Sequence, residues 1–166
     1  NRPIERQGGF AEYVSIPDKN IYELPKNLNM KEAPIAEPCA VALHAVELGE
    51  KESFKSYKDS NVLVIGAGAI GLLCGLILSK VKKCKDIVIV DPNNKRLKQS
   101  LKYLDADGYK PDSKSILNDH FDVIFDSICL LINFDDSPYI KASLIFLCIC
   151  LIFSKFFSFA LPPNIK

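Results

Sequence analysis

Three glycines of this chain stand at the spacing of a nucleotide-binding turn. Gly66, Gly68 and Gly71 form the pattern G-x-G-x-x-G, in which Ala69 and Ile70 separate the last two glycines. In such a turn the first glycine permits a sharp bend, the second lets the backbone approach a pyrophosphate, and the third allows close packing of helix on strand. The unpaired amides at the start of the following helix favour a bound anion. The pattern therefore predicts that this turn binds the phosphates of a dinucleotide.

An acidic residue follows at the distance that suits recognition of a ribose. Asp91 comes 20 residues after Gly71, directly after an apolar run, where a carboxylate can accept hydrogen bonds from an adenosine ribose. The same charge repels a 2′-phosphate, so the sequence favours NAD over NADP. Arg96 is included in the predicted cofactor site; it and Lys95 weaken this preference slightly. The alternative is a strand–turn–helix that binds no phosphate, in which Asp91 only caps the next helix.

The segments on either side of the glycines have the pattern of a parallel α/β sheet. Residues 62–65 and 87–90 are continuous apolar runs, which is typical of strands buried on both faces. Between them, apolar residues at helical spacing predict a helix. These are Ile70, Leu73, Cys74, Ile77, Leu78 and Val81. The order predicts a right-handed, doubly wound sheet.

The chain after the second strand continues this order. Leucines at helical spacing predict a helix within residues 92–104, and a short strand is predicted near Tyr109. Residues 121–125 predict a fourth strand that ends at Asp126. Asp126 and Ser127 would then lie at the carboxyl edge of the sheet, where ligands bind in such folds. A contact with the cofactor is therefore one interpretation of these two residues.

The amino-terminal part predicts strands and one helix. Residues 10–16 and 21–24 have the composition of two short strands. Asn29 and Glu32 have the form of a capping box and predict a helix that extends to about Leu48. Pro38 is expected to kink that helix or to divide it. The charged residues 50–60 are expected to form a linker.

Composition narrows the range of functions. The chain carries 21 basic and 20 acidic residues, a net charge of +1, so no basic face for nucleic acid is indicated. Its six cysteines include no C-x-x-C pair, which argues against a zinc ribbon or a disulfide framework and favours free thiols in the cytoplasm. No signal peptide is evident. Because the first residue is Asn1, we expect the N-terminus to be incomplete.

The carboxyl-terminal segment has a different character. Residues 142–161 are almost entirely apolar, with Lys155 as their only charge, and no glycine follows Gly108. A run of this length can cross a bilayer, so a tail anchor is one interpretation, and buried strands or spurious translated sequence are the others. The pattern is neither clearly amphipathic nor alternating. We predict only an irregular apolar tail over residues 134–166.

Several stretches together resemble one enzyme family, the zinc-dependent medium-chain alcohol dehydrogenases, in particular the sorbitol and polyol dehydrogenase branch. The matching stretches occur in the family's order over about residues 1–126. They are GGFAEYV at residues 8–14, Leu24-Pro25, AEPCAVALHA at residues 36–45, and residues 62–71 with Asp91.

This resemblance implies hydride transfer from a secondary alcohol, within a small alcohol or polyol, to NAD. It also implies a homo-oligomer and a catalytic zinc that acts as a Lewis acid. In the polyol branch, the residue at the position that Glu37 matches supplies a carboxylate to the zinc or to its bound water. The other ligands in the family, a cysteine and a His-Glu pair, lie upstream of the part that this chain matches. Glu37 is therefore expected to be a remnant of the metal site, and this chain is not expected to retain zinc. His44 is expected to be a packing residue.

The predicted fold class is α/β. It consists of an incomplete doubly wound (Rossmann) parallel sheet, preceded by the end of a β-rich catalytic domain and followed by the apolar tail. Residues 1–50 would be the remnant of the catalytic domain with its connecting helix, 51–133 a partial NAD-binding domain, and 134–166 the tail. Residues 127–166 are expected to lack the family's further strands, as if a retained intron or a frameshift had joined foreign sequence to a dehydrogenase segment.

Three functional alternatives follow. The first is a truncated dehydrogenase that binds NAD without turnover. The second is a non-catalytic nucleotide-binding module, tethered to a membrane through residues 142–161. The third is a product that does not fold, because half of a doubly wound sheet leaves an edge and an apolar face uncovered.

Overall fold

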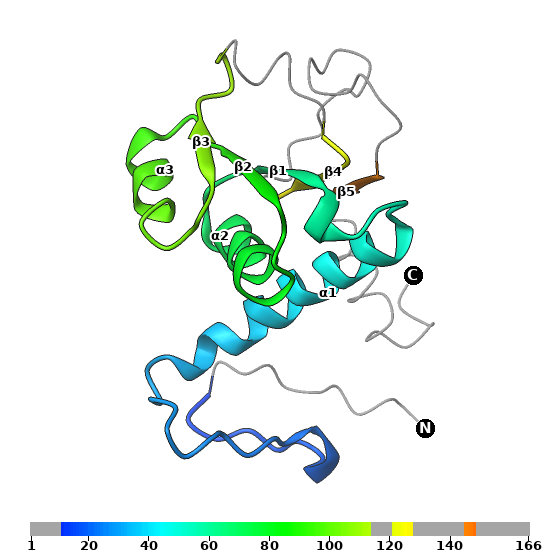
Figure 1. The fold of residues 1–166 in the computed structure, drawn as a ribbon. Helices are drawn as coiled ribbons and strands as arrows, with labels where there is room; N and C mark the ends of the chain where they lie inside the picture. Colours follow the sequence, from blue (N-terminus) through cyan, green and yellow to red (C-terminus); the bar gives the residue numbers. More distant parts are fainter. Residues whose placement is uncertain (1–10, 114–120, 128–144, 149–166) are drawn as a thin grey trace, which may run out of the picture. The chain divides into compact units, whose positions relative to one another are not determined.

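The structure, a computed structural model, describes residues 11–113, 121–127 and 145–148 of the chain. By compactness the chain divides into two units, Asn1–Pro34 and Ile35–Lys166. The second unit contains the sheet and the helices that surround the glycine-rich turn (Figure 1).

The second unit is built on one parallel sheet. The strands are β1 (Asn61–Ile65), β2 (Asp86–Val90), β3 (Asp107–Tyr109), β4 (Val123–Asp126) and β5 (Ile145–Cys148). Their order in the sheet is β3-β2-β1-β4-β5, and every neighbouring pair is parallel. The predicted α/β class with a parallel sheet is confirmed.

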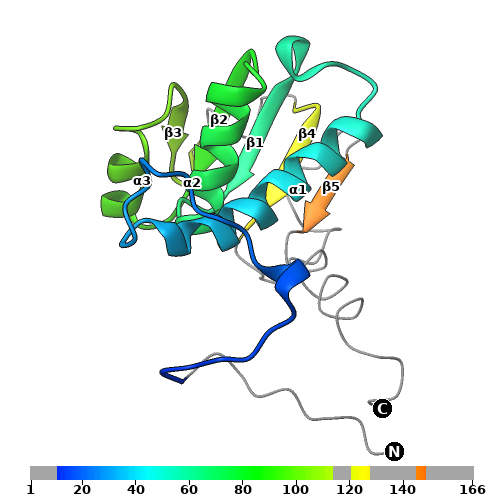
Figure 2. The same ribbon diagram turned by 90° about the horizontal axis from the view of Figure 1, so that it is seen from below.

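Three helices pack against one face of this sheet. They are α1 (Ala36–Glu52), α2 (Ala69–Leu76), which continues as the π-helical turn η4 (Ile77–Val81), and α3 (Asn94–Ser100). Figure 2 shows α1 and α2 lying side by side over the strands. The alternate residues of each strand that face these helices form the larger buried cluster of the unit, which includes Val64, Ile89 and Phe125.

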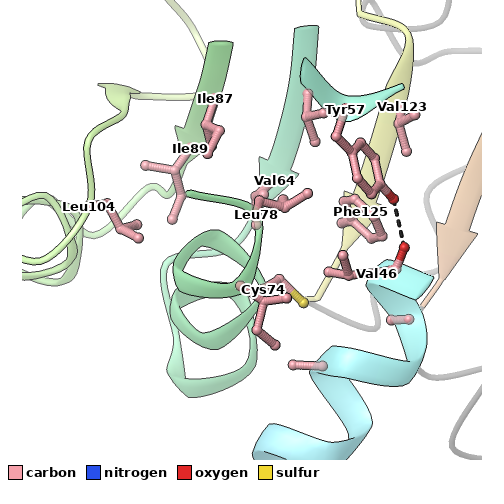
Figure 3. Packing of buried hydrophobic residues seen from close by; sticks show 14 of the residues in the cluster. Val46, Tyr57, Val64, Cys74, Leu78, Ile87, Ile89, Leu104, Val123 and Phe125 are labelled. Atoms are coloured by element: carbon pink, nitrogen blue, oxygen red, sulfur yellow. Dashed lines mark hydrogen bonds between the residues drawn. The ribbon is translucent and has the colours of Figure 1, made fainter. Parts of the chain in front are cut away.

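A tyrosine from the segment between α1 and β1 completes this cluster. Tyr57 lies in the short 3₁₀-helix η3 (Tyr57–Asp59) and is 1% exposed. Its hydroxyl donates a 2.8 Å hydrogen bond to the carbonyl of Val46, and its ring lies 6.5 Å from that of Phe125 (Figure 3). The segment predicted as a linker therefore carries a core residue, because the aromatic ring can be buried while its hydroxyl is satisfied.

The opposite face of the sheet is also apolar. Its buried residues are Leu63, Ile65, Val88, Val90, Phe121 and Ile124, with Tyr109 partly buried against them. Because successive side chains of a strand point to opposite faces, these residues alternate along the strands with those of the larger cluster. The continuous apolar runs in the sequence thus correspond to strands buried on both faces.

The first helix differs from its prediction. Residues 29–32 form a turn, in which the Asn29 side chain accepts a hydrogen bond from the Lys31 amide, and α1 begins at Ala36 and ends at Glu52. Pro38 therefore lies in the first turn of the helix and not in its interior. Amides of the first turn have no partner within the helix, so a proline is tolerated there without a kink.

The predicted amino-terminal strands are not present in the described part of the first unit. Residues 11–30 run as extended chain and turns around the short 3₁₀-helix η1 (Asp18–Asn20). A strand is stabilised by hydrogen bonds to a neighbouring strand, and no strand is found among residues 11–34. The composition of these residues favours strands, but composition alone does not provide the partner.

The helix after the glycines also departs from its predicted pattern. Cys74, Ile77 and Leu78 are buried as predicted, but Val81 is 65% exposed. The Lys82 amide bonds to the carbonyl of Ile77, five residues earlier, which is the pattern of a π-helical turn. Val81 is the last residue of this turn, in which Ile77 and Leu78 are the buried residues.

The segment after β4 supplies a strand, which corrects the expectation that residues 127–166 contain none. β5 pairs in parallel with β4, with Val123 aligned to Ile145 and Asp126 to Cys148. The rest of the predicted apolar tail lies outside the described residues. Within the described part of the chain, no helix is long and apolar enough to span a membrane.

Candidate dinucleotide-binding site

The strands bring the predicted site residues to one edge of the sheet. The register aligns Ile65, the last residue of β1, with Val90 of β2 and with Asp126 of β4. The residues that follow these three strand ends are Gly66, Asp91 and Ser127. Because parallel strands end at the same edge, the glycine-rich turn and the acidic residue become neighbours although 24 residues separate Ala67 from Asp91.

Gly66 makes the bend between β1 and the turn. Its φ angle is 100°, in the left-handed region that residues with a side chain rarely adopt. Its amide donates a 2.7 Å hydrogen bond to the carbonyl of Val90 and so ties the turn to β2. The requirement for glycine is therefore a requirement of the backbone.

Gly68 has open space where a side chain would stand. A Cβ atom built on it would meet no other atom within 4 Å. Gly68 is also the N-cap residue of α2, and no side chain caps that end of the helix. The first amides of α2, which begin with the exposed Ala69 and the half-buried Ile70, are thus available to a ligand. An anion that approaches this end would meet amides and no side chain at Gly68.

Gly71 is required for a different reason. A Cβ atom there would stand 1.8 Å from the carbonyl oxygen of Gly66 and 2.8 Å from the hydroxyl oxygen of Ser127. This is the close approach of helix to strand that the third glycine of the motif permits. Gly66 thus makes the bend and Gly71 permits the close packing, while the role of Gly68 toward a pyrophosphate stays a prediction.

The Asp91 side chain points into the turn. It is buried, and its Oδ2 atom accepts a 2.9 Å hydrogen bond from the amide of Ala67. Its Oδ1 atom accepts a 2.6 Å hydrogen bond from the amide of Asn93. The helix that follows is capped by Asn93, whose side chain accepts hydrogen bonds from the amides of Lys95 and Arg96. Asp91 is therefore not the cap of that helix.

Arg96 lies beside this carboxylate. Its Nη2 atom is 3.3 Å from Oδ1 of Asp91, and its side chain is 54% exposed, against 3% for that of Asp91. An exposed arginine can change partner at little cost, because water screens the ion pair it leaves. The structure thus brings Arg96 to the predicted cofactor site.

Two serines also contact the turn. The hydroxyl of Ser100, at the end of α3, donates a 3.2 Å hydrogen bond to the carbonyl of Ala67. The hydroxyl of Ser127 lies 2.7 Å from the carbonyl oxygen of Ile65 and 3.2 Å from that of Gly66. The sequence placed Ser127 at the sheet edge but gave no indication of Ser100, since no motif links it to a turn 33 residues away.

The described residues do not form a zinc site. Glu37 is exposed in the first turn of α1, and no group of three or more His, Cys, Asp or Glu residues suited to a metal occurs in the described ranges. A catalytic zinc needs about three protein ligands. His44 lies on the same helix, is exposed and interacts with another residue, and its interpretation as a packing residue stays a prediction.

The fold keeps two thiols, those of Cys74 and Cys84, protonated. Burial, and then the neighbouring Cys39, raise the pKa of Cys74 to about 12. Burial also raises the pKa of Cys84 to about 11. Because a thiolate is both the nucleophile and the metal ligand, these two residues are inert at neutral pH.

The comparison with curated proteins identifies relatives. The chain is 35% identical over 95 residues to galactitol 1-phosphate 5-dehydrogenase of Escherichia coli, which covers 55% of this chain and 25% of that protein. It is 34% identical over 110 residues to D-xylulose reductase A of Aspergillus oryzae, covering 66% and 29%. It is 32% identical over 141 residues to (R,R)-butanediol dehydrogenase of Saccharomyces cerevisiae, covering 78% and 35%.

The chain is homologous to part of the zinc-dependent medium-chain alcohol and polyol dehydrogenases. The resemblance drawn from the sequence is thus confirmed. The chain spans 25% to 35% of the length of these curated relatives. No model of a protein family matches it.

Solved dehydrogenase structures have the same fold over the shared part. Galactitol-1-phosphate dehydrogenase of Escherichia coli superposes with a TM-score of 0.61 at 28% identity, over 74% of this chain and 36% of that one. An Escherichia coli alcohol dehydrogenase in complex with NADH gives 0.66 at 25% identity, over 75% and 37%. A zinc-binding dehydrogenase of Sinorhizobium meliloti bound to NADP gives 0.61 at 25% identity, over 73% and 36%.

Proposed function

We propose that this chain binds NAD as the cofactor-binding part of a medium-chain alcohol or polyol dehydrogenase. The observation that carries the proposal is the arrangement of the turn. Gly68 leaves open space at the uncapped end of α2, and the Asp91 carboxylate is bonded to the adjacent residue, Ala67. A diphosphate would be bound by the amides of residues 68–71, with Ala69 and Ile70 supplying the first amides of the helix.

The adenosine ribose would be recognised by Asp91. Its Oδ2 atom accepts the Ala67 amide, and an ionised carboxylate oxygen has a second lone pair for a ribose hydroxyl. The second hydroxyl would reach Oδ1 when the exposed Arg96 moves away, and the freed guanidinium would then contact the cofactor. The buried negative charge disfavours a 2′-phosphate, so we propose a preference for NAD over NADP that the positive charge of Arg96 moderates.

The chemistry of the longer protein follows from the resemblance. We propose that it transfers hydride from a secondary alcohol of a small alcohol or polyol to NAD. The described residues of this chain hold no zinc site, so we propose that this chain alone binds the cofactor without turnover. A role for Glu37 toward zinc is proposed only for a protein that also carries the upstream ligands.

Calorimetric titration of the full chain with NAD and NADP tests this function. We expect NAD to bind more tightly than NADP. Asp91→Asn removes the charge and leaves a single oxygen, which can accept the Ala67 amide but not that of Asn93 as well. This variant should weaken NAD by about tenfold and reduce the difference in affinity between NAD and NADP. Asp107→Asn removes an exposed charge at the start of β3, where Asp107 is aligned with Val88 of β2, and it should change neither affinity. A folded chain that binds no NAD would refute the proposal.

A turnover assay distinguishes the cofactor-binding segment from a complete enzyme. We expect no NADH from the purified 166-residue chain with sorbitol and NAD, with or without added zinc. Zinc-dependent production of NADH would show that the chain assembles a catalytic site by itself and would overturn this part of the proposal. Nucleotide binding without turnover also fits a non-catalytic module; the full transcript distinguishes the two, because only a dehydrogenase requires the upstream cysteine and His-Glu pair.

A further inference from the structure

We propose that the hydroxyls of Ser100 and Ser127 act as positioning groups that aim the amides of the glycine-rich turn at a diphosphate. Neither hydroxyl needs to contact the ligand. The inference rests on the proposed binding of NAD and adds two residues that hold the binding turn in its working conformation.

Ser100 acts on the peptide group between Ala67 and Gly68. Its side chain is buried, and its hydroxyl donates to the carbonyl of Ala67 at 3.2 Å. A peptide group is planar and trans, so its C=O and its N–H point in opposite directions. By holding the Ala67 carbonyl toward α3, Ser100 fixes the Gly68 amide away from α3. The Cα of Gly68 has open space beside it, on the side from which a ligand can approach.

Ser127 acts on the preceding peptide groups. Its amide donates to the carbonyl of Ile65 at 3.0 Å, and its single hydroxyl proton is shared between that carbonyl at 2.7 Å and the Gly66 carbonyl at 3.2 Å. The N–H opposite the Gly66 carbonyl is that of Ala67, which donates to Asp91. Ser127 thus links the end of β4 to the turn and supports the peptide group through which Asp91 is held.

The two serines together keep carbonyl oxygens away from the anion. A carbonyl oxygen that rotated toward the diphosphate would repel it and would withdraw an amide at the same time. The turn contains Gly66 at a φ of 100° and Gly68 without steric neighbours, so the glycines themselves offer little resistance to such a rotation. The side-chain hydrogen bonds supply the resistance, which is the preorganisation that lowers the cost of binding.

The test compares ADP, which contains the diphosphate, with adenosine, which contains the ribose but no phosphate. We expect Ser100→Ala and Ser127→Ala each to weaken ADP by about three- to tenfold, the range for one hydrogen bond. Ser100→Ala should weaken adenosine by less than about twofold; Ser127→Ala is compared on ADP only, because Ser127 also supports the Ala67 amide that is bonded to Asp91. A purely structural role would weaken both ligands alike. The measurement is an NMR titration of the full chain, which also reports the Gly68 amide signal directly.

Ser60→Ala is the matched control. Ser60 is buried, and its hydroxyl also donates to a backbone carbonyl, that of Ser56 at 2.8 Å, but it precedes β1 at the opposite edge of the sheet. We expect this variant to lose stability without any change in the affinity for ADP. Equal losses of ADP affinity in the Ser60 and Ser100 variants would contradict the proposal.

Conservative variants of Ser127 separate the hydrogen bond from the size of the side chain. Ser127→Thr keeps the hydroxyl and should retain the affinity for ADP, whereas Ser127→Cys keeps a similar volume with a weak donor and should behave as alanine does. ADP binding that is unchanged in both serine-to-alanine variants would refute the positioning role alone. Failure of the unmodified chain to bind ADP would refute the proposed function, and this inference with it.

Discussion

Gly68 and Gly71 belong to one motif, but the structure predicts that substitution affects ligand binding at Gly68 and folding stability at Gly71. Gly68→Ala adds a methyl group into open space, so we expect the free energy of unfolding to change by less than about 1 kcal/mol. The same methyl group stands where the diphosphate would approach, and NAD affinity should fall at least about tenfold. Gly71→Ala places a methyl group 1.8 Å from the Gly66 carbonyl oxygen and should cost about 2 kcal/mol or more of stability.

Urea denaturation and calorimetry of these two glycine variants measure the contrast. The variants control for each other, since each replaces glycine with alanine within the same turn. If Gly68→Ala lowers the free energy of unfolding but leaves the affinity for NAD unchanged, this result would contradict the proposal that the diphosphate binds in the open space beside Gly68.

The buried thiol of Cys74 makes stability depend on pH in a known direction. Its pKa is raised from 9.0 to about 12, so the folded chain retains a proton that the unfolded chain releases. This stabilisation is complete below about pH 9 and is lost as the pH rises toward 12, by at most about 1.4 kcal/mol per pH unit. Between pH 8 and pH 10, under reducing conditions, the free energy of unfolding should decrease less for Cys74→Ala than for the unmodified chain. An equal decrease in the two proteins would contradict the conclusion that burial of the Cys74 thiol stabilises the folded chain below about pH 9.

At the scale of single residues, the sequence predicts the contacts that a motif encodes and misses those that the fold creates. The glycines and Asp91 have a fixed spacing because one strand–turn–helix–strand unit must place them together. Ser100 bonds to a carbonyl 33 residues away, and Ser127 to one 61 residues away. Each is an ordinary serine in the sequence, and only the register of the sheet and the packing of α3 bring it to the turn.

At the scale of elements, hydrophobic periodicity locates the strands and helices of the sheet, while their ends depend on local hydrogen bonding. The sequence did not predict the π-helical turn in η4, because the apolar residues continue at ordinary helical spacing up to Val81. The strand β5 was missed for another reason. A short apolar run can be a strand or part of a buried helix, and the choice is made by pairing with β4.

Tyr57 connects two elements of the core by one hydrogen bond. Burial is the main cause that raises the pKa of its hydroxyl, which therefore remains a donor to the Val46 carbonyl of α1. Tyr57→Phe should reduce the free energy of unfolding by about 1 kcal/mol, because only the hydrogen bond is lost and the ring stays in place. NAD affinity should be unchanged, since η3 precedes the amino end of β1. Chemical denaturation measures the first effect and calorimetry the second; a stability unchanged within error would contradict the structural role.

At the scale of the whole molecule, β5 decides whether the segment after β4 contributes to the fold. Removal of residues 128–166 would expose the edge of β4, whose Val123, Ile124 and Phe125 are fully buried. We expect the shortened chain to melt at a lower temperature and to aggregate, because an open apolar strand edge pairs with other chains. Melting and light scattering of the two lengths provide the test. Equal or higher stability of the shortened chain would favour the hypothesis that foreign sequence follows the dehydrogenase segment.

The central claim is that the amides at the start of α2 bind the diphosphate of NAD. Amide NMR of the full, folded chain during titration with NAD tests it most directly. The largest shifts are predicted at Gly68, Ala69 and Ile70, with a smaller shift at the Ala67 amide that is bonded to Asp91. Saturating NAD that leaves these four signals unmoved, or that shifts mainly residues at the opposite edge of the sheet, would contradict the account.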